Sequence, residues 1–226
     1  AVPGKWHVMG VTQGAGLSLR WFRDQFGASE AWLAHQTGVD PYELIIEQAA
    51  KIPPGSQGLL WLPYLMGERT PHLDARARGM WFGLTAAHTR GHMIRSILEG
   101  VAFSLRDSLE IFTELEIPVE QIRVSGGGSR SFLWRQIQAD IYGKELVTLR
   151  TSEGSAFGAA LLAGVGAGIY ASVQESAHAA IQIRESMTPH AGNTCLYNRQ
   201  YQIYRTLYPT VRELAHQLGA IGEETR

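Results

Sequence analysis

The sequence predicts a layered α/β fold, because patterns typical of short strands alternate along the chain with patterns typical of amphipathic helices. Of the 226 residues, 45% are hydrophobic and 18% are charged, so the chain can bury a substantial core. A strand, three consecutive glycines and a helix follow one another between Gln121 and Lys144. The other predicted elements are arranged around this unit.

The N-terminal part is predicted to be mainly helical. Gly27 closes the first helix pattern, and Asp40-Pro41 is a favourable start for a later one, because proline fits the first helical position. Residues 52–56, Ile-Pro-Pro-Gly-Ser, are expected to form a loop inside one domain. The expected elements are a strand at 6–11 and helices at 17–26, 28–36 and 42–50.

The middle of the chain is predicted to contain two short strands and the longest helix. The apolar run 59–66 includes a proline and therefore indicates a buried strand that ends in a turn, before a polar loop at 67–74. A second strand is expected at 80–84. Apolar residues recur along one stripe from His92 to Leu115, which indicates a helix that Ile117-Pro118 ends.

The central unit has the strongest ligand-binding signal. Residues 122–124 alternate as in a half-buried strand, and Gly126–Gly128 can take positive φ and let a flat ligand approach the main chain. The helix pattern that follows ends at Gly143, and its N-terminus would present N–H groups to an anion or a nucleotide. A tight βα turn that binds nothing explains the same glycines, so both interpretations stay open.

The C-terminal part is predicted to contain one strand, at 145–149, and two helices. Small residues at 154–162 indicate a helix that crosses a neighbouring helix closely. Three glycines between 164 and 168 follow this helix, so they indicate its end rather than a phosphate loop. A final amphipathic helix is expected at 193–218, with an interruption at Pro209.

Composition argues against several classes of function. The net charge is −1 and no segment concentrates Lys and Arg, which argues against nucleic acid and anionic membranes as partners. Cys195 is the only cysteine, so no internal disulfide is possible. No apolar run approaches the ~18 residues of a membrane span, and no signal-peptide pattern is visible. These features predict a cytoplasmic protein.

Individual side chains give no strong catalytic or metal-binding signal. His88 and His92 are four residues apart but lack the glutamate of a metalloprotease helix, and no metal site is predicted. The glycines lack the spacing of a dinucleotide fold, and no phosphate-loop lysine is present. Glu68 and Arg69 could contact a phosphate or pair with each other on the surface, and these interpretations stay open.

Four motifs occur in order along the chain. Residues 62–72 read Leu-Pro-Tyr-Leu-Met-Gly-Glu-Arg-Thr-Pro-His, and the stretch from Gly79 to Glu99 contains Gly-x-Trp-x-Gly-Leu followed by His-Met-x-x-Ser-Ile-Leu-Glu. Residues 125–131 read Ser-Gly-Gly-Gly-Ser-Arg-Ser, and 153–160 read Glu-Gly-Ser-Ala-Phe-Gly-Ala-Ala. Together they resemble the C-terminal domain of the FGGY family of carbohydrate kinases, most closely its xylulokinases. The third resembles the adenosine motif of the sugar kinase, Hsp70 and actin superfamily, and the fourth resembles its second connecting helix.

The resemblance implies a ribonuclease-H-like α/β domain of the actin-like ATPase superfamily, with a mixed sheet flanked by helices. It implies ATP or ADP as the cofactor, with Mg²⁺ held mainly through the phosphates and through another domain. Gly126 and Gly127 would lie against the adenosine and the α-phosphate, and Gly128 would continue the turn. The residues that the resemblance assigns to nucleotide binding are Gly126, Gly127, Gly128, Ser131, Gly16 and Arg20.

The family's N-terminal domain supplies the catalytic Asp and most of the sugar pocket, and neither is expected in this chain. Residues 1–226 are therefore expected to form a single C-terminal, nucleotide-side domain that is inactive alone and contains no catalytic residue. The full-length protein would transfer the γ-phosphoryl group of ATP to a sugar hydroxyl, with D-xylulose to D-xylulose 5-phosphate as the expected reaction. Its partners would be ATP, a small sugar and the N-terminal domain, and a homodimer stays open.

Other interpretations stay open beside this one. Ribulose, gluconate and glycerol are alternative substrates within the family. An actin-like or chaperone-like ATPase half is a rival, although the stretch from Gly79 to Glu99 argues against it. A non-catalytic nucleotide-binding or interaction module is a rival of another class, and the missing catalytic half is the argument for it.

Overall fold

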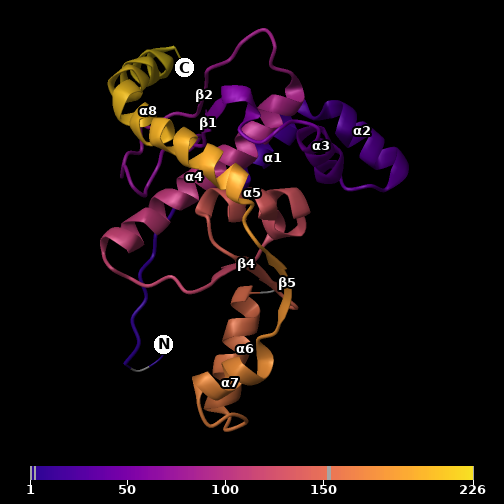
Figure 1. Cartoon of the computed structure of the whole chain (residues 1–226), viewed down its shortest axis with the longest axis vertical. Helices are drawn as coiled ribbons and strands as arrows, with labels where there is room; N and C mark the ends of the chain where they lie inside the picture. The colour runs from indigo at the N-terminus through magenta and orange to yellow at the C-terminus, as the bar shows by residue number, and fades with distance from the viewer. Residues whose placement is uncertain (1, 3, 152–153, 226) are drawn as a thin grey trace.

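The computed structural model describes residues 2, 4–151 and 154–225, and Figure 1 shows two unequal parts along its longest axis. The larger part is a helical body around the long helix α4 (Arg90–Glu114). The smaller part is a short sheet with a helical hairpin at the far end of the molecule. Within the described ranges, no helix has both the length and the apolar character needed to cross a lipid bilayer.

The helical body has one core, to which α1, α3, α4, β1 and α8 all contribute. Trp61, Phe103 and Tyr204 are among its largest fully buried side chains. Asp40 caps α3 as expected, because its carboxylate accepts a hydrogen bond from Tyr42 N at 2.9 Å. The bounds are α1 (Ala15–Phe26), α2 (Ala28–Thr37), α3 (Pro41–Ala50), β1 (Leu60–Leu62), β2 (Met80–Phe82) and α8 (Ala191–Glu224), with β1 and β2 antiparallel.

The smaller part contains a mixed sheet of β3 (Ile122–Val124), β4 (Leu146–Leu149) and β5 (Ile183–Met187) in that order. β3 and β4 are parallel, whereas β5 is antiparallel to β4. Helix α5 (Phe132–Tyr142) connects β3 to β4 and contacts α4, α8 and the sheet. The sheet is therefore joined to the helical body through α5, and the predicted mixed sheet packed against helices is confirmed.

A helical hairpin of α6 (Gly154–Gly166) and α7 (Val173–Ala180) projects beyond the sheet (Figure 1). Helix α6 ends as predicted: Gly168 has a φ of 73°, and Ile169 N donates to Gly164 O at 2.9 Å. A Cβ added at Gly158 would meet no atom of the described residues within 4 Å. The close helix crossing expected for these small residues is therefore not made at Gly158 by the described residues, and it stays a prediction.

Two predictions of regular structure were wrong. Residues 6–11 form no strand, because no described strand pairs with them and the side chain that should begin the buried face, Trp6, is 98% exposed. Pro209 does not interrupt α8, which continues through it to Glu224, and Tyr204 and Tyr208 just before it are buried in the core. The elements α7 and β5 had no sequence prediction at all.

Glu99 lies among the buried apolar residues of α4 and is held there by a network of hydrogen bonds. Glu99 accepts hydrogen bonds from Gly55 N at 2.9 Å, Ser56 Oγ at 2.7 Å and Arg95 Nε at 2.8 Å, and from Tyr197 OH at 2.7 Å. Burial raises the pKa of the Glu99 carboxyl, and its donors oppose that rise. These five residues, called the Glu99 network below, join α4, α8 and the loop after α3.

Candidate functional site

The three glycines after β3 form a sharp turn into α5. Gly126 has φ 79° and ψ −172°, a combination that essentially only glycine adopts. Its carbonyl accepts hydrogen bonds from Ser129 N at 3.2 Å and Ser129 Oγ at 2.7 Å, which close the 3₁₀ turn Gly127–Arg130. Ser131 then caps α5 by accepting from Trp134 N at 3.1 Å. The turn is therefore fixed by its own backbone and by two serines.

The glycines differ in the space around them. A Cβ added at Gly126 or Gly127 would meet no described atom within 4 Å, so open space lies against the backbone there. At Gly128 the added Cβ would lie 3.1 Å from the Trp134 ring, so a side chain here would press against that ring. Trp134 in turn donates from Nε1 to Leu98 O at 3.1 Å, which fastens the turn to α4. An open backbone on a hydrogen-bonded support fits a flat ligand such as a nucleotide.

The start of α6 lies beside the same turn. A Cβ added at Gly154 would be 3.6 Å from Ser125 Oγ, so the first residue of α6 is close to the residue that precedes the glycines. Residues 152–153, which include Glu153 of the fourth motif, lie outside the described residues. Two helix starts, those of α5 and α6, therefore flank the turn, and helix starts favour anions.

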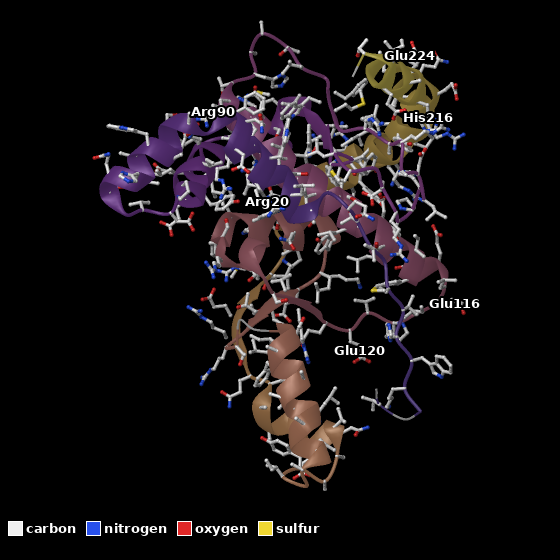
Figure 2. The ribbon with its side chains drawn as sticks, turned by 180° about the vertical axis from the view of Figure 1, so that it is seen from behind. Arg20, Arg90, Glu116, Glu120, His216 and Glu224 are labelled. Carbon is white, nitrogen blue, oxygen red and sulfur yellow. The ribbon has the colours of Figure 1, made fainter. Side chains whose placement is uncertain are left out.

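The second predicted segment begins α1. A Cβ added at Gly14 would lie 1.7 Å from Pro63 O, so this glycine is required where α1 begins against the chain that follows β1. A Cβ at Gly16 would meet no described atom within 4 Å, and Arg20 is exposed. Figure 2 labels Arg20 on α1, near the middle of the molecule. No hydrogen bond or ion pair between described residues joins α1 to the glycine turn.

Glu68 is a residue that the sequence interpretation misplaced. It is neither a surface partner of Arg69 nor available to a phosphate, because it is only 3% exposed. Its carboxylate accepts hydrogen bonds from Thr12 Oγ1 at 2.8 Å, Gln13 N at 3.1 Å and Arg69 N at 2.7 Å. Burial raises the pKa of the Glu68 carboxyl, and these donors lower it in part. The one available sequence signal was a glutamate two residues after the apolar run 59–66.

Two hollows in the described ranges are lined by residues other than the three glycines of the turn. One hollow of about 270 Å³ lies between α4 and α8, next to Asp107 and Tyr201. Another of about 420 Å³ lies beside α5 and the start of α8. Among the residues that the structure describes, no group of three or more His, Cys, Asp or Glu side chains is arranged to hold a metal ion. Neither hollow is lined by Gly126, Gly127 or Gly128.

Comparison with known proteins places the chain among sugar kinases. A family model described as the C-terminal domain of the FGGY family of carbohydrate kinases matches residues 1–167. The xylulose kinase of Bacillus subtilis is 38% identical over 208 residues, which are 92% of this chain and 40% of that protein. The gluconokinase of the same organism is 42% identical over 167 residues, which are 74% of this chain and 32% of that protein.

A solved structure agrees with the sequence comparison. The crystal structure of xylulose kinase from Rhodospirillum rubrum matches with a TM-score of 0.76 and 31% sequence identity, over 92% of this chain and 40% of that one. The predicted ribonuclease-H-like fold of the actin-like ATPase superfamily is thereby confirmed. The chain spans about two fifths of the length of the xylulose kinases it matches.

Proposed function

This chain belongs to the FGGY family of carbohydrate kinases, and we propose that it is the single, nucleotide-side C-terminal domain of a longer kinase. The observation that supports this most directly is the hydrogen-bonded turn with open backbone at Gly126 and Gly127. The full-length kinase transfers the γ-phosphoryl group of ATP to the hydroxyl of a small sugar. The catalytic base and the sugar pocket belong to the part of the kinase that precedes this domain, so the domain alone is inactive.

The residues of this chain bind and orient the nucleotide in the proposal. Gly126 and Gly127 receive it on bare backbone, and Ser131 and the exposed Arg20 contact its edges beside Gly16. Gly128 contributes indirectly, because it lets Trp134 support the turn. The starts of α5 and α6 favour the negative charge of the phosphates. When bound, ATP with Mg²⁺ supplies the phosphoryl group and most of the charge compensation for its transfer.

D-Xylulose is the proposed substrate, with D-xylulose 5-phosphate as the product. The support is that xylulose kinases of Bacillus subtilis and Lactococcus lactis match 92% and 99% of this chain at 38% and 37% identity. Gluconate is the second candidate, because a gluconokinase reaches 42% identity over a shorter stretch. Sugar choice depends on the other domain, so identity within this domain ranks the candidates without deciding between them.

The test is ADP release by the whole gene product that contains this chain, measured with xylulose, gluconate, ribulose and glycerol. The proposal expects the highest kcat/KM with xylulose and none with the 226-residue chain alone. Highest kcat/KM with gluconate would keep the kinase and replace the sugar. Sugar-dependent turnover by the 226-residue chain alone would contradict the proposed division between the domains.

A further inference from the structure

Glu68 is a buried carboxylate with no role in the function proposed so far. It lies in the loop between β1 and β2 and is 3% exposed. Two of its three closest donors, Thr12 Oγ1 and Gln13 N, belong to the segment that enters α1. A buried charge costs free energy unless it is hydrogen-bonded, so these contacts determine where that segment must lie.

The segment 11–14 is attached on several sides. Ser104 of α4 donates from Oγ to Thr12 Oγ1 at 2.8 Å, so one hydroxyl chain runs from α4 through Thr12 to Glu68. Val11 and Thr70 exchange two hydrogen bonds, Val11 N to Thr70 Oγ1 at 3.0 Å and Thr70 N to Val11 O at 2.9 Å. The loop that contains Glu68 and the longest helix therefore hold the same short stretch of chain.

The attached stretch leads directly into α1. Gly14 O accepts hydrogen bonds from Ser18 N at 3.0 Å and Ser18 Oγ at 2.6 Å, and Gly14 itself lies hard against Pro63. Two residues separate Gln13 from Gly16, and Arg20 follows about one helical turn after Gly16. A shift of Thr12 and Gln13 would consequently move the first turn of α1.

We propose that Glu68 is a positioning residue for nucleotide binding: it fixes Thr12 and Gln13 so that Gly16 and Arg20 meet the nucleotide. The inference rests on the proposed function, because it assigns these two residues to the same site as the glycine turn. Glu68 itself does not touch the nucleotide. It acts through the backbone of the segment 11–14.

A purely structural role is the competing explanation, and Glu99 offers a matched comparison. Both glutamates are buried, at 3% and 2% exposed, and each accepts a hydrogen bond from a hydroxyl group, Thr12 Oγ1 at 2.8 Å and Ser56 Oγ at 2.7 Å. None of the residues that donate a hydrogen bond to Glu99 belongs to the two proposed nucleotide-binding segments, 16–20 and 126–131. Removing the Thr12 hydroxyl should therefore affect both stability and nucleotide binding, whereas removing the Ser56 hydroxyl should affect stability alone.

The experiment measures ADP affinity by calorimetry, KM for ATP and sugar, and the melting temperature of the whole gene product. The variants are Thr12→Val, Glu68→Ala and Glu68→Gln, with Ser56→Ala as the matched control. Glu68→Ala should raise the Kd for ADP and the KM for ATP about tenfold while leaving the KM for the sugar unchanged. Thr12→Val should raise both nucleotide constants about threefold, and Ser56→Ala should lower only the melting temperature.

Glu68→Gln is the conservative rescue. Its amide can accept from Gln13 N and Arg69 N and donate to Thr12, whose hydroxyl then turns toward Ser104, so ADP affinity should stay within about twofold of wild type. Equal effects of Thr12→Val and Ser56→Ala on ADP affinity would overturn the inference. If the Glu68→Ala variant does not fold, the comparison of these two variants is the deciding test. A wild type that fails to bind ADP would instead refute the proposed function.

Discussion

The Glu99 network and the glycine turn are opposite kinds of structure within one small domain. Glu99 is 2% exposed and has four hydrogen-bond donors from three parts of the chain. Gly126 and Gly127 are exposed, and no described atom lies within 4 Å of the Cβ that either would have. One region depends on side chains that are present and the other on side chains that are absent. Changes in the first should act on folding, and changes in the second on binding.

The largest expected effect is on the Glu99 network. Glu99→Ala leaves Arg95 buried without its charge partner. The two side chains pair at 2.8 Å, and the side chains of Glu99 and Arg95 are 3% and 6% exposed, respectively. The free energy of unfolding should fall by roughly 3–5 kcal/mol, measured by urea denaturation. The control is Glu110→Ala on the same helix, where a more exposed pair with Arg106 should be worth about 1 kcal/mol or less. Similar losses for both variants would contradict the account.

The second largest effect is expected at Asp107, a buried carboxylate with fewer hydrogen-bond donors than Glu99. Among the described residues, Asp107 has one hydrogen-bond donor, Tyr201 OH at 2.7 Å, and burial raises the pKa of its carboxyl to about 6. Because the folded pKa is above the unfolded value of 3.8, its contribution to stability is fully present below pH 3.8 and is lost as the pH rises through about 6. Asp107→Asn removes this loss, up to about 3 kcal/mol.

Urea unfolding between pH 3 and 8 checks the Asp107 prediction. The wild type should lose stability between about pH 4 and pH 6 relative to Asp107→Asn, because the two proteins differ only in the Asp107 carboxyl, which titrates in this range. Curves that stay parallel over this range would show that burial does not raise the pKa of Asp107 in the folded protein, and would contradict the prediction.

Gly126→Ala should have a mixed effect, because this glycine is both strained and open. Its φ of 79° with ψ of −172° should make alanine cost about 1–3 kcal/mol, and ADP binding should be lost as well. Gly143→Ala is the matched control, since Gly143 also has a positive φ, 62°, at the other end of α5. The control should lose stability but keep ADP affinity, as measured by thermal unfolding and calorimetry. Loss of ADP affinity in both variants would attribute the effect to folding alone.

The smallest effect on stability is expected for Arg20→Ala. Arg20 is exposed and makes no hydrogen bond or ion pair with the described residues, so the melting temperature should not change. The Kd for ADP should rise about threefold to tenfold, because one charged contact is removed. Arg199→Ala, at an exposed position of α8, is the control and should change neither quantity. An unchanged Kd for Arg20→Ala would remove α1 from the proposed site.

Periodicity predicted the elements whose residues face a core within this chain. Helices α1, α3, α4 and α5 were expected within a few residues of their bounds, since each has an apolar stripe that the core buries. Strand β5 was missed because Arg184 and Glu185 interrupt its apolar pattern and Ile183 is 49% exposed. The segment 6–11 was wrongly predicted as a strand, because its residues alternate but no strand among the described residues pairs with it.

The candidate site was only partly accessible to sequence reasoning. Gly126 and Gly127 were assigned through a motif, and the structure adds that their backbone is open while Gly128 is filled by Trp134. Glu68 was misplaced, because its partners Thr12 and Gln13 are 56 and 55 residues away in the sequence. No local pattern shows which distant backbone groups a glutamate will contact. Burial and long-range hydrogen bonds therefore had to come from the structure.

The most direct measurement is ADP binding to the whole gene product and to its Gly127→Ala variant, with melting temperatures recorded beside it. Gly127 does not have a positive φ, and an added Cβ meets no described atom within 4 Å, so alanine should leave the fold intact. The account predicts an unchanged melting temperature and at least about tenfold weaker ADP binding, because the methyl group occupies the space of the nucleotide. A Gly127→Ala variant that binds ADP as tightly as the wild type would contradict the claim that this turn is the nucleotide site.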